Sequence, residues 1–189
     1  MIQNYLISNK FLLLVKHGEM NKITRYVNFP LWIPLIAVLV SVICYYIGAV
    51  ILSGFGIIFS LLYIVYCIII EFLVIFRSCK NCWYYGKVCG LGKGKVAPLF
   101  VKKGDTKKFA DRDISIKHLI PDFMVIILPL VGGAILLIRD FSVVLLVLLI
   151  ILVIVFFSGT ALIRGTFACN YCMQKDIGCP ADKVFNKKK

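Results

Sequence analysis

Four long apolar runs dominate the hydrophobic pattern of the chain, and nearly all of its charged residues lie between these runs. A bilayer core of about 30 Å requires roughly 20 residues of helix, and the first, second and fourth runs reach that length. The third run is short, and the four residues that precede it extend it to the required length. We therefore predict an all-α integral membrane protein with four transmembrane helices, at residues 31–52, 55–76, 119–138 and 141–163.

The composition agrees with this pattern. The chain of 189 residues is 61% hydrophobic and 16% charged, with a mean hydropathy of +0.94. A soluble domain is about half apolar and a quarter charged. The first run begins too late and is too long for a signal peptide, so we expect it to remain as a membrane span. The four runs leave no room for a second sizeable domain.

The distribution of lysine and arginine predicts the orientation. Residues 1–30 hold four of them, residues 77–121 hold eleven and residues 164–189 hold six. The two short turns between paired runs hold a single arginine, which has an aspartate beside it. Because cytoplasmic segments carry the excess of basic residues, both termini and the middle segment are expected in the cytoplasm. The sequence thus predicts a protein of the cytoplasmic membrane with its two hairpin tips outside.

The formal net charge of +13 therefore lies on one face of the predicted protein. Basic residues near a membrane surface attract anionic lipid headgroups, so membrane lipids are the expected partners. The chain has no base-reading motif, and we expect no nucleic-acid partner. The sequence leaves open whether the protein forms a homo-oligomer or a hetero-oligomer.

An internal repeat is the most informative feature of the sequence. Residues 15–22 read VKHGEMNK and residues 101–108 read VKKGDTKK, each after a short apolar stretch. A predicted helical hairpin and a cysteine cluster follow in both halves, and the cysteines recur at an offset of 90 residues. Each half crosses the membrane twice, so the halves would be parallel repeats related by an axis along the membrane normal. Both cysteine clusters would then lie on the same face.

These matches predict two tandem domains. The first repeat, 1–90, contains an interfacial segment at 5–22, its helical hairpin and a cysteine cluster at 79–89. The second repeat, 91–189, contains an interfacial segment at 96–108, its hairpin, a cysteine cluster at 169–179 and a basic tail. Within the first cluster, the aromatic string Trp83-Tyr84-Tyr85 is typical of an anchor at the membrane interface.

The eight cysteines divide into two kinds. Cys44 and Cys67 lie inside apolar runs and are expected to be ordinary buried thiols. The other six form two copies of C-x2-C-x6-C, namely Cys79, Cys82, Cys89, Cys169, Cys172 and Cys179. Disulfides are disfavoured on a reducing cytosolic side, although reversed topology would restore them. Thiol redox exchange and metal ligation remain, and the third cysteine in each copy favours metal.

Three sulfurs per half leave each tetrahedral ion one ligand short, unless two sulfurs bridge a pair of ions. The repeated C-x2-C-x6-C resembles the spacing in Zn2Cys6 modules, in which six thiolates are the ligand set. The resemblance covers the six cysteines alone. It implies the shared coordination scheme and not DNA binding, because 79 residues separate Cys89 from Cys169 and no basic reading helix is evident.

A ligand of another type could complete each site. Glu19 and Asp105 occupy matching positions in the repeat, each after a glycine, while His17 and His118 are the two histidines. The ordinary roles of these residues are helix N-terminal charges for the acids and surface positions for the histidines. They are therefore possible additional ligands and not primary ones.

Zinc is the expected metal, because the tight C-x2-C-x2-C spacing of ferredoxins is absent. An iron–sulfur cluster is the alternative. We expect a structural or assembly role in which the metal joins the ends of the two hairpins. The alternatives are a membrane electron-transfer or thiol-redox protein and a small transporter or channel component. No set of catalytic residues is evident, so an enzyme is not favoured, although three ligands plus water is the usual catalytic zinc arrangement.

Glu71 is the one ionisable residue well within an apolar run. Intramembrane charges are costly and are often functional, so this residue is the candidate for an ion or substrate path. It lies near the cytoplasmic end of its helix, and the favoured interpretation is an ion pair with Arg77 or Arg164.

Overall fold

The computed structural model describes residues 25–110 and 116–179, and within these ranges it is all-helical with no strand. Its long helices are α2 (Trp32–Leu52), α3 (Ile57–Arg77), α5 (Ile116–Arg139) and α6 (Val143–Thr160), which continues as the π-helical η5 (Ala161–Ala168). The short elements are η2 (Ser53–Phe55), η3 (Cys79–Asn81), η4 (Ala97–Leu99), α4 (Thr106–Ala110), η6 (Cys169–Tyr171) and α7 (Met173–Gly178).

Four of these helices are long and apolar enough to cross a membrane, which confirms the number of helices that the hydrophobic pattern predicts. The third begins before the apolar run because residues 116–122 join it, and this extension supplies the length that the run lacks. Most large apolar side chains of the four helices remain exposed, as expected of helices surrounded by lipid.

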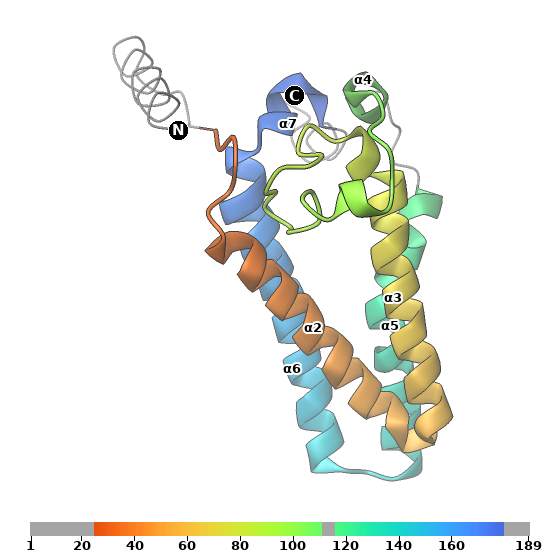
Figure 1. Ribbon diagram of the computed structural model, residues 1–189. Helices are drawn as coiled ribbons and strands as arrows, with labels where there is room; N and C mark the ends of the chain where they lie inside the picture. The colour runs from red at the N-terminus through yellow and green to blue at the C-terminus, as the bar shows by residue number, and fades with distance from the viewer. Residues whose placement is uncertain (1–24, 111–115, 180–189) are drawn as a thin grey trace.

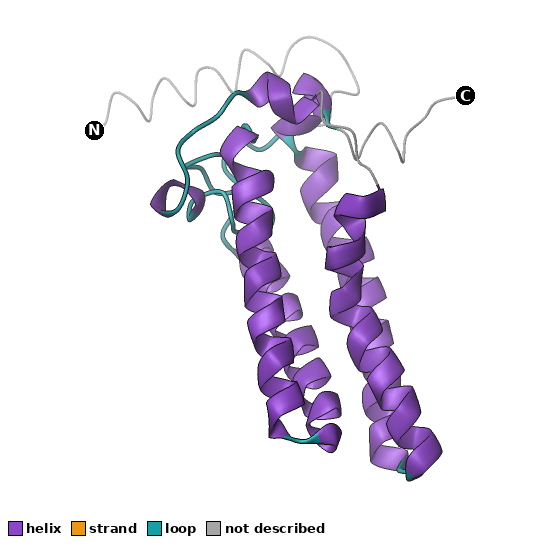
Figure 2. Ribbon diagram, turned by 90° about the vertical axis from the view of Figure 1, so that its right-hand side faces the viewer, coloured by secondary structure: helices purple, strands orange, loops and turns teal. Residues whose placement is uncertain are grey.

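The two hairpins stand side by side, each closed by a short turn at the same end of the bundle (Figure 2). Helices α2 and α5 run toward those turns, and α3 and α6 run back. We call the opposite end, formed by residues 25–31, 78–110 and 169–179, the cysteine end (Figure 1). The described chain begins and ends there, so both cysteine clusters lie at one end of the bundle.

Two apolar clusters hold the helices together. One joins α2, α5 and α6 and includes Cys44, and the other joins α2, α3 and α5 and includes Cys67. These two thiols are 5% and 1% exposed, so both are buried among helices as the sequence predicted. The helix α2 contributes to both clusters and is the central element of the bundle.

A proline in α5 is compensated by a neighbouring helix. Pro129 has no N–H, so it cannot donate the helical hydrogen bond to the carbonyl of Val125, four residues earlier. The hydroxyl of Tyr63 on α3 donates to this carbonyl at 2.8 Å. On α2, Gly48 provides the space, because a Cβ there would lie 2.5 Å from the Tyr63 hydroxyl. Three helices are thereby joined at one backbone group that lipid could not satisfy.

The loop after α3 fills the space between α2 and α3 at the cysteine end, where the two helices diverge (Figure 1). Gly92, with φ of 78°, adopts a backbone conformation that favours glycine, and it lies against Pro34 and Val38 of α2. Leu91 packs on a buried cluster formed by α2 and η5. The loop therefore contacts both hairpins.

Candidate cysteine site

The two C-x2-C turns have nearly the same backbone conformation. Each is a 3-10 turn directly after a long helix, and its second cysteine is extended, with φ/ψ of −79°/147° at Cys82 and −83°/123° at Cys172. In both turns this cysteine donates its N–H to the carbonyl of the first, at 3.2 Å for Cys82 and 3.4 Å for Cys172. Positions that are 90 residues apart thus adopt one local structure.

The two turns also bind each other through reciprocal hydrogen bonds. The N–H of Trp83 donates to Oε1 of Gln174 at 2.8 Å, and the N–H of Met173 donates to the hydroxyl of Tyr84 at 3.0 Å. Trp83 corresponds to Met173 and Tyr84 to Gln174 at the offset of 90 residues. Trp83 thus contacts Gln174, and their counterparts Met173 and Tyr84 contact each other in the same way. Such a reciprocal pair of contacts is the pattern of a two-fold interface.

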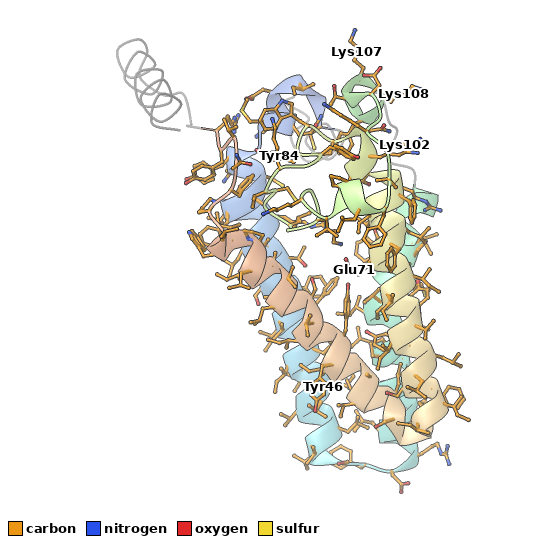
Figure 3. The ribbon with its side chains drawn as sticks, viewed as in Figure 1. Tyr46, Glu71, Tyr84, Lys102, Lys107 and Lys108 are labelled. Atoms are coloured by element: carbon orange, nitrogen blue, oxygen red, sulfur yellow. The ribbon has the colours of Figure 1, made fainter. Side chains whose placement is uncertain are left out.

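Tyr84 and Gln174 are each 2% exposed and form the centre of the cysteine end. The Tyr84 hydroxyl also donates to the carbonyl of Tyr26 at 2.5 Å, and the amide of Gln174 donates to the carbonyl of Gly178 at 3.1 Å. The aromatic string suggested an interfacial anchor, but Tyr84 is buried among the loops (Figure 3). Sequence reasoning missed both residues as parts of the site, and their shared offset was the available signal.

Three sulfurs accept backbone N–H donors. Cys82 accepts from the N–H of Tyr84, and Cys172 accepts from the N–H of Gln174, which is again the same bond 90 residues apart. Cys89 accepts from the N–H of Gly94 at 3.2 Å. The same three cysteines pack against one buried apolar cluster of Phe29, Ile33 and Tyr84. Sulfurs from both halves therefore share a single environment.

The six thiols interact electrostatically across the two halves. Burial raises the pKa of Cys82 to about 11, and Cys89, Cys79 and Cys179 oppose its ionisation further. Burial raises the pKa of Cys172 to about 12, with added contributions from Cys82, Cys169 and Cys179. Both thiols therefore remain protonated at neutral pH. The thiolate is both the nucleophile of redox exchange and the form that binds metal, so either chemistry requires these protons to be displaced.

The remaining cysteines lie around this centre. Cys79 and Cys179 are half-buried, and Cys169 is exposed. Among the residues that the structure describes, no three Cys, His, Asp or Glu side chains are arranged to hold one metal ion. Ligation would accordingly require the thiol side chains to turn toward one another.

The additional ligand candidates contribute nothing to this centre in the described part of the chain. One carboxylate oxygen of Asp105 accepts the N–H of Lys107 at 2.9 Å at the start of α4, which is the ordinary helix-terminal role of an acid. His118 belongs to α5, but its side chain lies outside the described residues, as do Glu19 and His17 entirely.

Glu71 is ion-paired, with a partner that the sequence did not indicate. Oε2 lies 2.6 Å from Nζ of Lys93, in the glycine-rich loop of residues 90–94, and Oε1 accepts the Tyr45 hydroxyl at 2.6 Å. The carboxylate faces the space between α3 and α2, directly below the loops (Figure 3). The Lys93 ammonium and the Tyr45 hydroxyl therefore compensate this intramembrane charge.

A small pocket opens between α3 and α5 near this charge, lined by Arg77, Ser78 and Asp122 among others. Its volume is about 40 Å³. Pockets that bind organic ligands measure roughly 300–1,000 Å³. This pocket therefore does not accommodate an organic substrate.

Comparison of the chain with known protein families, with characterised proteins and with solved structures gives no match.

Proposed function

We propose that this membrane protein binds metal through the six cysteines of its two clusters, and that the metal joins the ends of the two hairpins. The expected metal is zinc, and an iron–sulfur cluster is the alternative. The role is structural or one of assembly. The single observation that carries the proposal is the shared environment of Cys82, Cys89 and Cys172, whose sulfurs accept N–H donors and pack against one apolar cluster. N–H donors to sulfur stabilise thiolates, which are the form that binds metal.

Metal binding would change the protonation of the thiols and the positions of their side chains at the cysteine end. The buried thiols are protonated at neutral pH, and a bound cation would displace their protons. Ligation also requires the side chains to converge, because no three of the described candidate ligands are arranged around one point. Since each half supplies three sulfurs, closure around shared ions would draw the two C-x2-C turns together.

The decisive experiment is metal analysis of the protein purified without oxygen or chelator, with its visible spectrum. We expect one to two zinc ions per chain and no colour. The variant Cys82→Ser/Cys172→Ser should lose the metal. The variant Cys44→Ala/Cys67→Ala is the matched control, because it removes two buried cysteines from the helices and should retain the metal.

Two results would redirect the proposal. Iron with acid-labile sulfide and a brown absorbance would make the protein an electron-transfer component, since N–H donors to sulfur also tune iron–sulfur clusters. A protein without metal, in which the six clustered thiols are alkylated readily, would end both metal proposals and leave redox exchange or packing.

We further propose that the cysteine end faces the cytoplasm. The described lysines of residues 78–110 all lie at this end, whereas the turn between α2 and α3 carries no charge. In spheroplasts, a membrane-impermeant amine reagent should leave the lysines at 102–108 unmodified until the membrane is permeabilised. Modification in intact spheroplasts would reverse the orientation.

A further inference from the structure

The segment between the glycine-rich loop and α4 exposes apolar side chains between lysines. Its 3-10 turn η4 is followed by Phe100, and Leu99 is 79% exposed while Phe100 is 46% exposed. Lys95 precedes the turn, and Lys102 and Lys103 follow it, all exposed. A short apolar element bordered by exposed cations is the pattern of a segment that lies in the headgroup region of a bilayer.

The position of this segment along α3 sets its depth. The ring of Phe100 meets that of Phe72 edge-on, with centroids 5.1 Å apart. Phe72 is five residues before Arg77, the last residue of α3, which corresponds to about 7 Å at 1.5 Å per residue. Interfacial elements insert their apolar face about 5–10 Å into the boundary between headgroups and acyl chains. With the end of α3 taken as the membrane boundary, the contact with Phe72 places Phe100 at interfacial depth.

We propose that residues 95–103 form an in-plane anchor whose occupant is an anionic lipid surface, with Leu99 and Phe100 among the acyl chains and the lysines on the headgroups. The lysines supply the charge complementarity, because no acidic residue lies between 95 and 103. Lys102 points away from the bundle at the level of the loops, whereas Lys107 and Lys108, on α4, lie farther from the membrane-spanning helices (Figure 3). This inference does not depend on metal binding.

The test is hydrogen exchange, followed by mass spectrometry, of the full chain in nanodiscs of phosphatidylcholine alone or with one third phosphatidylglycerol. We expect the amides of 96–101 to exchange about fivefold more slowly in the anionic discs, which corresponds to about one lysine–headgroup interaction. Raised salt should remove the difference. Inorganic phosphate added to the neutral discs should not reproduce the slowing.

A matched pair of charge variants completes the test. Lys102→Gln/Lys103→Gln should abolish the lipid dependence, while Lys107→Gln/Lys108→Gln removes the same charge from α4 and should leave it intact. Equal exchange in both kinds of disc, or equal loss in both variants, would overturn the proposal. Slowing that requires an added protein and not anionic lipid would identify this face as a protein-docking surface instead.

Discussion

The two halves of the cysteine end share one local structure for a few residues beyond the second cysteine, through Tyr84 and Gln174, and then diverge. After Cys82 the chain turns at Gly86 and forms the long loop, whereas after Cys172 it continues directly as α7. The shared part makes the reciprocal hydrogen bonds and the N–H bonds to sulfur. The divergent parts reach different targets, because the loop pairs with Glu71 and α7 pairs with the N-terminal segment through Arg25–Asp176. The contacts around Cys82 and Cys172 are thus matched between the halves, whereas the contacts with Glu71 and Arg25 are not.

The largest effect is expected from breaking the reciprocal contact at Gln174. Gln174→Leu leaves the Trp83 N–H unsatisfied and removes the bond to Gly178, so unfolding free energy should fall by about 3 kcal/mol. Unfolding in an SDS titration measures it. Tyr84→Phe breaks the matching bond and keeps the ring, so its cost should be similar. A double variant that costs much less than the sum would show coupling, and strict additivity would contradict a shared interface.

The next largest effect is expected from breaking the ion pair by which Lys93 attaches the loop to Glu71 of α3. Lys93→Met leaves the carboxylate of Glu71 without its cation and should lower stability by about 2 kcal/mol. The side chains are 23% and 33% exposed, so the loss stays below that of a fully buried pair. Lys93→Met/Glu71→Gln should recover most of the loss. Retained stability in the single variant would show that Lys93 does not stabilise Glu71. In the second half, Ala161 occupies the position 90 residues after Glu71, so no equivalent pair exists there.

A smaller effect should distinguish the two hairpins within the membrane. Pro129 lies in the second hairpin, and Leu39 occupies the matching position in the first. Tyr63→Phe removes the donor to the Val125 carbonyl and should cost about 1 kcal/mol by SDS titration. In a Pro129→Ala background, the N–H of the alanine can donate to this carbonyl, so the same substitution should cost less. An unchanged cost would show that the hydroxyl does not compensate the proline.

The smallest effect concerns pH in the metal-free protein. The pKa of Cys82 rises from its ordinary 9.0 to about 11, and that of Cys172 rises to about 12. Between pH 9 and 11 the unfolded chain releases these protons while the folded chain retains them, so stability should fall as pH rises. Unfolding with EDTA at pH 8 and pH 10.5 checks this. Cys82→Ser/Cys172→Ser should flatten the dependence, and an equally steep slope in that variant would assign it to other groups.

The sequence predicted the features that depend on local pattern. Apolar runs long enough to span a bilayer became helices. The parallel order of two tandem hairpins stays a prediction, based on the even number of crossings in each half. The partner of Glu71 could not be predicted, because Lys93 reaches it through a loop whose path depends on close contacts such as that of Gly92 with Pro34. The burial of Tyr84 could not be predicted either, because an aromatic string beside a membrane has the same composition whether it faces lipid or the protein interior.

The glycine-rich loop has a mechanical consequence for the bundle. Gly94 holds the Cys89 sulfur through its N–H, the adjacent Lys93 holds Glu71 on α3, and Gly92 rests on α2. Three successive residues thus connect one sulfur to two helices, because each of them makes a different contact. We therefore expect a displacement of Cys89 to be felt first where this segment touches α2 and α3, so the position of one sulfur is tied to the spacing of two helices inside the membrane.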